Sequence, residues 1–255
     1  MLYLSRLSKT APVGFPGFAA EPALGKGVNL LWWKLLASPF MGDIRTVLFD
    51  LDGTLIDSIE LILASYRYTM AEHGYAEVSD AEWLKGVGTP LRVQLGQWAS
   101  SQEQLEALVA TYRSYNLANH DRMVRAFPLV PELVRRIRAS GMRTGVVTSK
   151  NREGTRRGLR LVGIEDAIEV LVCADDVTRA KPDPEPVHRA VELLEADPAT
   201  TIFVGDSIHD LVSGRGAGVL TGAVLWGPFA RHELEPAEPD YWLETPEALE
   251  ELLLT

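Results

Sequence analysis

The sequence TVLFDLDGT, residues 46–54, places a short apolar run directly before two aspartates. A continuous apolar run of about 4–8 residues is typical of a strand buried on both faces of a parallel sheet. Asp50 and Asp52 would then lie just beyond the end of that strand, and Gly53 allows a tight turn after them. Ligands of open parallel sheets bind outside the carboxyl ends of the strands. The stretch therefore predicts an α/β core, and it predicts that the ligand site lies at the carboxyl ends of the strands.

Similar apolar runs recur along the chain and alternate with helical stretches. Pro131 precedes a helical stretch that ends at Gly141, and Pro184 precedes another. Strand and helix alternation indicates βαβ units, so we expect a Rossmann-like, doubly wound parallel sheet. The further runs expected to form strands are Thr144 to Val147, Val170 to Cys173, Thr201 to Val204 and Ala223 to Leu225.

One insertion separates the first two strands of this pattern. Residues 58–126 read as helices, with no convincing strand among them. We expect a helical cap over residues 58–126 and a core over residues 41–57 and 127–255. Within the cap, the loop of residues 86–91 either faces the site or is a plain helix–helix turn. The expected helices are Ile59 to His73, Asp80 to Lys85, Pro90 to Ala99 and Glu103 to Asn119.

Residues 1–40 differ from the rest of the chain. They are rich in Gly, Pro, Ala and Leu, have no sustained helical or alternating period, and end just before Met41. We interpret them as an extension that is disordered or reflects a mis-assigned start at a position before Met41. An amphipathic anchor around Trp32 and Trp33 is the competing interpretation.

Composition and charge narrow the function classes. The 255 residues carry a formal net charge of −10, which disfavours binding to nucleic acid and to anionic membranes. No run reaches the roughly 18 apolar residues that a membrane span needs, and the first 40 residues lack the order of a signal peptide. We therefore expect a cytoplasmic monomer or homodimer that acts on a small molecule.

The lone cysteine and the histidines suggest no further chemistry. Cys173 lies in an apolar run and is expected to be a buried small hydrophobe, so no disulfide framework is possible. Histidines 73, 120, 188, 209 and 232 are scattered, and we expect structural or exposed roles for them. Of these, only His209 falls near the expected site.

Polar residues follow the carboxyl ends of four of the expected strands. They should therefore converge on one crevice, although they are distant in sequence. Their types suit phosphoryl transfer. A carboxylate can attack phosphorus, and a nearby carboxyl group can move the protons of the leaving group and of water. A lysine can neutralise charge that builds up in the transition state. The residues are Asp50 and Asp52, Thr148 and Ser149, Lys181, and Asp206 and Asp210.

Each of these residues has an expected role. Asp50 is the candidate nucleophile and Asp52 the candidate acid and base. Mg²⁺ prefers oxygen ligands, which Asp50, Asp206 and a backbone carbonyl near Asp52 can supply. Thr148, its neighbour Ser149, and Lys181 are the candidates for phosphate binding.

At these residues the sequence resembles the haloacid dehalogenase superfamily. The stretch Asp50 to Leu55 matches its first motif, Thr148 the second, Lys181 the third, and residues 205–207 with Asp210 the fourth. The resemblance implies a C1-type helical cap, an Asp50 nucleophile, an Asp52 general acid and base, and Mg²⁺ held by Asp50, the Asp52 backbone carbonyl and Asp206. Asp210 would support the metal site.

Within the superfamily the chain is most similar to the phosphoglycolate phosphatase group and its pyrophosphatase branch. The similarity is carried by residues 112–128, by residues 147–159 and by residues 175–187. It implies phosphoglycolate or inorganic pyrophosphate as the substrate, and the sequence leaves the choice open.

The sequence allows three alternative functions. A β-phosphoglucomutase-like mutase is one, because residues 84–87 resemble its cap loop, although Gly88-Thr89-Pro90 departs from the expected serine and arginine. A haloacid dehalogenase is another, but it needs neither Asp52 nor magnesium. The third is a non-catalytic interaction protein on the same fold.

Overall fold

The computed structural model describes residues 44–76 and 78–255, which belong to one compact unit. The predictions for residues 1–40, including an anchor at Trp32 and Trp33, lie outside the described residues. Within the described part of the chain, no helix has both the length and the apolar character that a membrane crossing requires.

A six-stranded, wholly parallel sheet forms the core, which confirms the predicted α/β class. Its strand order is β5-β4-β1-β6-β7-β8, so β1 lies in the middle. Val47 of β1 pairs with Thr144 on one side and with Ile202 on the other. The strands are β1 (Thr46–Phe49), β4 (Arg143–Val147), β5 (Val170–Val172), β6 (Thr201–Gly205), β7 (Leu220–Val224) and β8 (Tyr241–Leu243).

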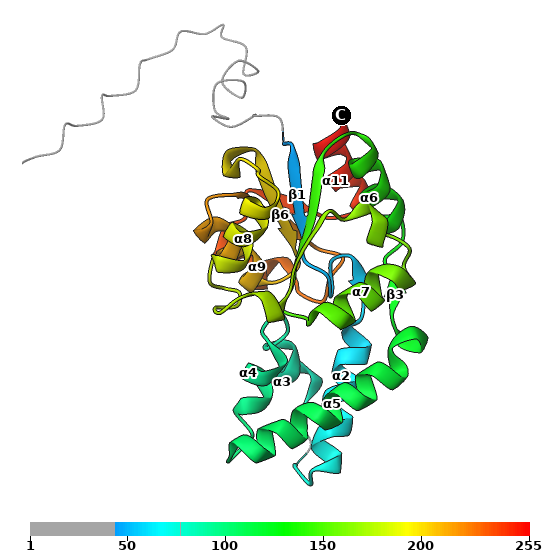
Figure 1. Cartoon of the computed structure of the whole chain (residues 1–255), viewed down its shortest axis with the longest axis vertical. Coiled ribbons are helices and arrows are strands. Elements are labelled where there is room, and N and C mark those ends of the chain that lie inside the picture. Colours follow the sequence, from blue (N-terminus) through cyan, green and yellow to red (C-terminus); the bar gives the residue numbers. More distant parts are fainter. Residues whose placement is uncertain (1–43, 77) are drawn as a thin grey trace, which may run out of the picture. The chain divides into compact units, whose positions relative to one another are not determined.

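Helices cover both faces of the sheet because its strands are apolar on both sides. Val47 and Phe49 pack in one cluster with residues of α6, α7 and α11, and Leu48 packs on the opposite face with residues of α8. Figure 1 shows α8 and α9 on one side of the sheet and α6, α7 and α11 on the other. The helices are α6 (Val130–Ala139), α7 (Arg152–Leu161), α8 (Glu185–Leu193), α9 (Ile208–Gly216), α10 (Arg231–Leu234) and α11 (Pro246–Leu254).

Two strands differ from the sequence prediction by more than one residue at an end. β7 begins three residues earlier than expected, because Thr221 and Gly222 interrupt the apolar pattern at its start. β8 was not predicted, because it is a three-residue strand at the edge of the sheet and only Leu243 is fully buried in it. Short edge strands carry little periodic signal.

The insertion is helical, as predicted, and has an apolar core of its own. Tyr66 stacks on Trp83 with ring centroids 4.2 Å apart, and Tyr112 packs against the same ring of Tyr66 at 4.8 Å. Leu95 and Leu108 complete the centre of this cluster and are fully buried. The helices are α2 (Ile59–Glu72), α3 (Asp80–Leu84), α4 (Leu91–Gly96) and α5 (Gln102–Met123).

A two-stranded antiparallel ribbon joins the insertion to the core. Ile56 of β2 (Ile56–Asp57) pairs with Ala126 of β3 (Arg125–Ala126). The expectation that residues 58–126 contain no strand is therefore wrong at their last two positions. The pairing brings the entry and the exit of the insertion side by side.

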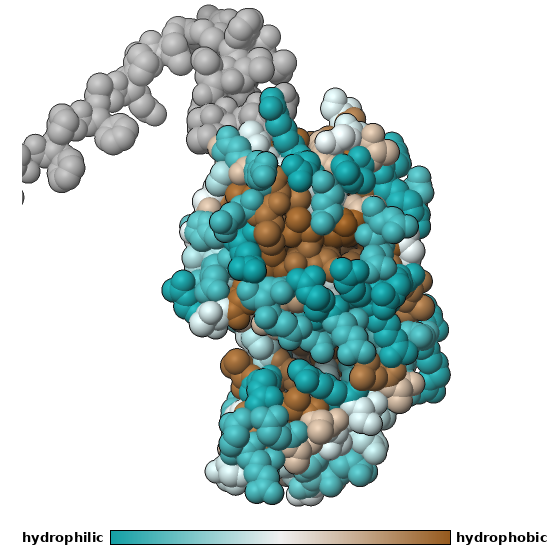
Figure 2. All heavy atoms as spheres, in the orientation of Figure 1, coloured by the Kyte–Doolittle hydropathy of each residue, from teal (hydrophilic) through white to brown (hydrophobic). Residues whose placement is uncertain are grey.

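The surface is mostly hydrophilic. Figure 2 shows polar residues over most of the visible face, with an apolar area on the α/β core between α8 and α6. Several large apolar side chains are exposed in this protein, among them Leu193 of α8 and Leu161 of α7.

Candidate active site

Asp50 lies directly beyond β1, in the centre of the sheet, and is almost fully buried. Its backbone N–H donates to Val204 O, which continues the sheet pairing by one residue. The Lys181 ammonium lies 2.6 Å from Asp50 Oδ1 and is itself buried. Burial outweighs this attraction and raises the pKa of Asp50 to about 7.

Lys181 joins two carboxylates. Its Nζ donates to Asp50 Oδ1 and to Asp210 Oδ1, each at 2.6 Å, and to Val147 O at 3.2 Å. A buried lysine with three acceptors has its full set of hydrogen bonds. Because burial disfavours an unpaired ammonium, the two carboxylates are what keep Lys181 charged at this depth.

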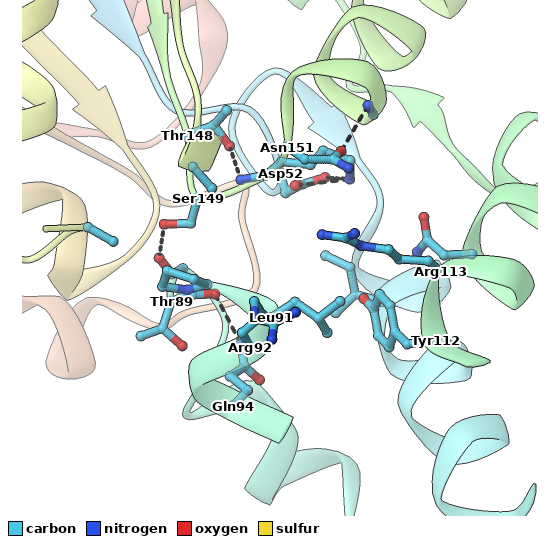
Figure 3. Close-up of a pocket in the computed structure, with 18 of the residues that line it drawn as sticks. Asp52, Thr89, Leu91, Arg92, Gln94, Tyr112, Arg113, Thr148, Ser149 and Asn151 are labelled. Atoms are coloured by element: carbon cyan, nitrogen blue, oxygen red, sulfur yellow. Dashed lines mark hydrogen bonds and ion pairs between the residues drawn. The ribbon is translucent and has the colours of Figure 1, made fainter. Parts of the chain in front are cut away.

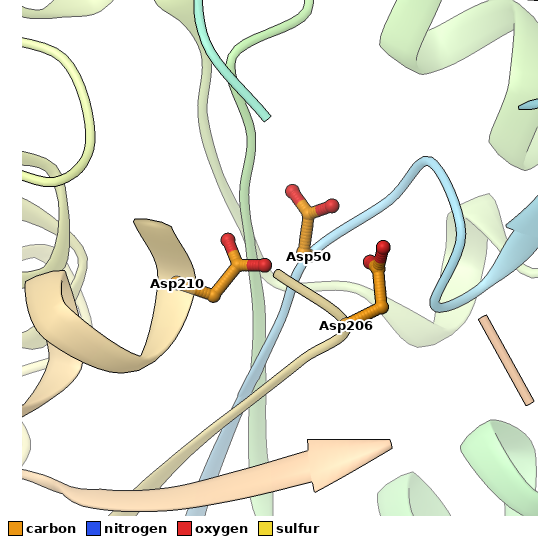
Figure 4. Close-up of side chains that lie close together, drawn as sticks. All are labelled: Asp50, Asp206 and Asp210. Carbon is orange, nitrogen blue, oxygen red and sulfur yellow. The ribbon is translucent and has the colours of Figure 1, made fainter. Parts of the chain in front are cut away.

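Asp206 and Asp210 follow β6 and face Asp50. Figure 4 shows the three carboxylates pointing toward one another, and one oxygen from each lies within 4.8 Å of the others. Asp210 Oδ2 accepts from the backbone N–H and from the hydroxyl of Ser207, at 3.0 and 2.6 Å, as the N-terminal cap of α9. Both oxygens of Asp210 are thus already bonded, which suits a supporting position.

Asp206 has one oxygen without a partner. Thr54 Oγ1 donates to its Oδ1 at 2.8 Å, while the buried Oδ2 accepts no hydrogen bond within the described part of the chain. Burial, followed by the charges of Asp210 and Asp50, raises the pKa of Asp206 well above its usual range. Gly53, at φ +91°, keeps the space beside this oxygen open, since a Cβ there would lie 2.6 Å from Asp206 Oδ2.

These carboxylates fit a hard divalent cation. An orphaned buried carboxylate oxygen costs free energy, and so do like charges brought together in a site of low polarity. A cation that binds Asp206 Oδ2 and Asp50 would remove both costs at once. All of the donors are oxygens, which Mg²⁺ prefers.

Asp52 points away from this cluster toward the core side of the pocket. Lys150 Nζ lies 2.8 and 3.1 Å from its two oxygens, and Ser58 Oγ donates to Oδ1 at 2.5 Å. Burial alone would raise the pKa of Asp52, but Lys150 and Ser58 together lower it. Asp52 is therefore a carboxylate in this arrangement.

Thr148 and Ser149 lie beyond β4 with different partners. The backbone N–H of Thr148 donates to Val172 O, so it is used by the sheet and only the hydroxyl of this residue is left for phosphate. The Thr148 hydroxyl accepts the N–H of Lys150 at 3.2 Å and keeps its proton for another acceptor. Ser149 Oγ donates to Gly88 O of the insertion at 2.6 Å.

One cavity of about 450 Å³ lies between the core and the helical insertion. Figure 3 shows residues of the insertion, among them Thr89, Arg92 and Arg113, facing Asp52 and Asn151 of the core. The loop of residues 86–91 faces the site, because its residues 87–91 line the cavity together with Asp50 and Asp52. Cavities of this size hold small ligands.

Several lining residues had no predicted role. Lys150 belongs with Thr148 and Ser149 to the polar stretch expected at the end of the second strand, but its ion pair with Asp52 spans 98 positions and has no local signal. His120 was expected to be structural, with only His209 near the site, yet it also lines the cavity. The available signal was the spacing of Arg113, Asn116 and His120, at i, i+3 and i+7, which places them on one face of α5.

Fold and site together define an α/β protein with a carboxylate-rich crevice beneath a helical insertion. The sequence profile of the haloacid dehalogenase-like hydrolase family matches residues 47–224, so the chain belongs to this family. Pyrophosphatase PpaX of Anoxybacillus flavithermus is 36% identical over 202 residues, covering 79% of this chain and 93% of that protein. Pyrophosphatase PpaX of Bacillus mycoides is 38% identical over 201 residues, with coverage of 79% and 93%.

Solved structures share the fold. A haloacid dehalogenase-like family hydrolase from Streptococcus pneumoniae superposes with a TM-score of 0.71 at 25% identity, covering 81% of this chain and 96% of that one. A structure described as a predicted phosphoglycolate phosphatase from Haemophilus somnus superposes with a TM-score of 0.76 at 21% identity, covering 83% and 99%. The agreement over nearly all of those chains confirms the fold class.

Proposed function

We propose that the chain is a magnesium-dependent phosphohydrolase that works through an aspartyl phosphate at Asp50. The observation that carries the proposal is the convergence of Asp50, Lys181 and Asp206 in one buried cluster, of which Asp50 lines the cavity. Family membership and relatives named as pyrophosphatases support the reaction class.

In the first step Asp50 attacks phosphorus. Its Oδ1 is held by Lys181, so Oδ2 is the oxygen left for attack. A P–O bond to Oδ2 forms and the bond from phosphorus to the leaving group breaks. The Thr148 hydroxyl still has its proton to donate to the phosphoryl oxygens. Lys181, whose three N–H groups are already bonded, stabilises the developing negative charge through its own positive charge.

In the second step water attacks the aspartyl phosphate, which releases phosphate and restores Asp50. Asp52 takes the proton from that water, a role that suits the carboxylate favoured by Lys150 and Ser58. As the acid of the first step, Asp52 must carry a proton, so it must leave the ion pair with Lys150.

Bound Mg²⁺ would be held by Asp50, Asp206 and the backbone carbonyl of Asp52, and would supply positive charge between the nucleophile and the phosphoryl group. Asp210 is the supporting residue, because it fixes Lys181 and the start of α9. Ser149 is proposed as a phosphate-binding residue. Its hydroxyl, which donates a hydrogen bond to Gly88 O, would donate to the substrate phosphate instead.

The relatives' names favour inorganic pyrophosphate as the substrate, and the sequence motifs leave phosphoglycolate as the second candidate. We also propose that residues 58–126 act as a cap that closes on the core of residues 41–57 and 127–255. The β2–β3 ribbon lies where such a hinge is needed. A cytoplasmic location and a monomeric or dimeric state stay predictions.

The test is phosphate release from pyrophosphate, phosphoglycolate and an aryl phosphate, with Mg²⁺ and with EDTA, followed by acid quench and mass analysis of the Asp50 peptide. We expect Mg²⁺-dependent turnover and a phosphorylated Asp50. Asp50→Asn should lower kcat by about 10⁴- to 10⁶-fold, as loss of a nucleophile does.

The alternatives give different results. Interconversion of hexose phosphates would favour the mutase, and no release at high enzyme concentration would favour a binding protein. Activity on haloacids that survives EDTA would favour the dehalogenase. Normal turnover by Asp50→Asn would refute the proposed nucleophile.

A further inference from the structure

The cavity contains three cationic side chains from the insertion and the neighbouring core loop, and two of them are already paired. Lys150 holds Asp52, and Arg92 holds Glu106 through both of its terminal nitrogens, one of them at 2.9 Å. Neither has a free charge for a ligand in this arrangement.

Arg113 is the third. Among residues 44–76 and 78–255 its guanidinium makes no hydrogen bond and no ion pair. Figure 3 shows the side chain reaching from α5 into the cavity, toward Asp52 and Asn151. Asn116, one turn further along α5, lines the same wall.

We propose that Arg113, with Asn116 beside it, binds the second anionic group of the substrate, the one that is not transferred to Asp50. The inference rests on the proposed phosphohydrolase activity and defines its substrate class as small molecules with two anions. A planar guanidinium binds carboxylate or phosphate through two parallel hydrogen bonds. Pyrophosphate and phosphoglycolate both present such a group.

The position of Arg113 supports this assignment. Its helix belongs to the insertion, whereas the Asp50 cluster belongs to the strand ends of the core, so the two ends of a substrate would contact different parts of the chain. A substrate with an anion at each end would bridge them. A phosphate ester with a neutral leaving group would contact only the core.

Two carboxylates could pair with Arg113. Hydrogen bonds from Arg92 and Gln102, and to a smaller degree the charge of Arg113, lower the pKa of Glu106, so Glu106 lies near both guanidinium groups. Glu153 of α7 lines the cavity from the core side and makes no ion pair with Arg113 in the structure. If Arg113 and Glu153 paired on closure of the cap, Arg113 would act on every substrate alike. The experiment must therefore separate a closure contact from recognition of the substrate.

Arg113→Gln is compared with the unaltered protein on pyrophosphate, phosphoglycolate and p-nitrophenyl phosphate, all with Mg²⁺. We expect kcat/KM for the two substrates with a second anionic group to fall about 10- to 100-fold, the value of a hydrogen bond to a charged group. The value for p-nitrophenyl phosphate, which has only the transferred phosphate group, should change less than about threefold. A larger loss on only one of the first two substrates shows whether Arg113 prefers phosphate or carboxylate.

Two variants serve as controls. The double variant Arg92→Gln/Glu106→Gln removes a guanidinium of the same cavity together with the carboxylate that holds it. It should have a much smaller effect on the substrates with two anionic groups. Glu153→Gln should leave the preference for these substrates intact. Equal losses on all three substrates in Arg113→Gln, matched by Glu153→Gln, would overturn the inference in favour of a closure contact.

A binding measurement separates failure of this inference from failure of the proposed function. Methylenediphosphonate with Mg²⁺ is titrated calorimetrically into both proteins. Weaker binding to Arg113→Gln supports the inference even if no substrate is turned over, and equal binding to both proteins refutes it.

Discussion

The buried carboxylate of Asp50 makes the stability of the metal-free protein depend on pH. Its pKa rises from 3.8 to about 7 on folding, mainly because of burial. Between these two values the folded state holds a proton that the unfolded state has lost, so stability falls as pH rises. At about 1.36 kcal/mol per pH unit, the full effect is about 4 kcal/mol, and about 2.5 kcal/mol of it falls between pH 5 and pH 7.

Asp50→Asn removes the contribution of Asp50 to this pH dependence of stability. Loss of the Asp50 charge also lowers the pKa of Asp206, because Asp50 is one of the charges that raise it, so both changes act in the same direction. We compare the free energy of unfolding of the variant with that of the unaltered protein at each pH. The difference should shift by about 2–3 kcal/mol in favour of the variant's stability between pH 5 and pH 7.

Urea unfolding in EDTA at the two pH values measures this double difference. Asp166→Asn, at an exposed aspartate of the 3₁₀ turn Glu165–Ala167, is the matched control and should show no such change. At pH 7, added Mg²⁺ should stabilise the unaltered protein more than Asp50→Asn. A double difference of zero, or one of opposite sign, would show that Asp50 is not held in an unfavourable charged state.

Three further predictions concern catalysis, metal binding and the first residues. Asp52→Asn should lower kcat by about 10²- to 10⁴-fold, the usual contribution of an acid–base group, in a steady-state assay with pyrophosphate. Thr54→Val removes the hydroxyl that donates to Asp206 Oδ1 and should weaken Mg²⁺ binding about tenfold or more, measured calorimetrically; unchanged affinity would contradict the metal site. Deletion of residues 1–40 should leave the circular dichroism spectrum and turnover unchanged, and loss of either would show that the segment is needed.

The convergence of the candidate site residues could be predicted, because their positions depend on sheet topology alone. Asp50, Thr148 and Asp206 each directly follow a buried strand, and parallel strands bring their carboxyl ends to one edge. The apolar runs before them are continuous, so their strands are easily recognised. β8 breaks this pattern, since two of its three residues are only half-buried.

The partners of these residues could not be predicted, because they depend on how the insertion packs on the core. Arg113 and His120 share a helix face, but sequence does not tell which face of α5 meets the core. Ser149 was expected at phosphate and instead bonds Gly88, a contact across 61 positions between loops with no regular period. Long-range contacts of this kind follow from tertiary packing and leave no local pattern.

The charges of the site imply an order of binding. Four buried or half-buried aspartates face two lysines, so the metal-free centre has an excess of negative charge although its substrate is an anion. Arg113 does not reverse this excess. Burial raises the pKa values of Asp50 and Asp206, and the neighbouring carboxylates raise them further, so both groups favour a proton where no cation is bound. On the proposed mechanism we therefore expect a divalent cation to bind before the substrate, because its charge would make the site attract a phosphate.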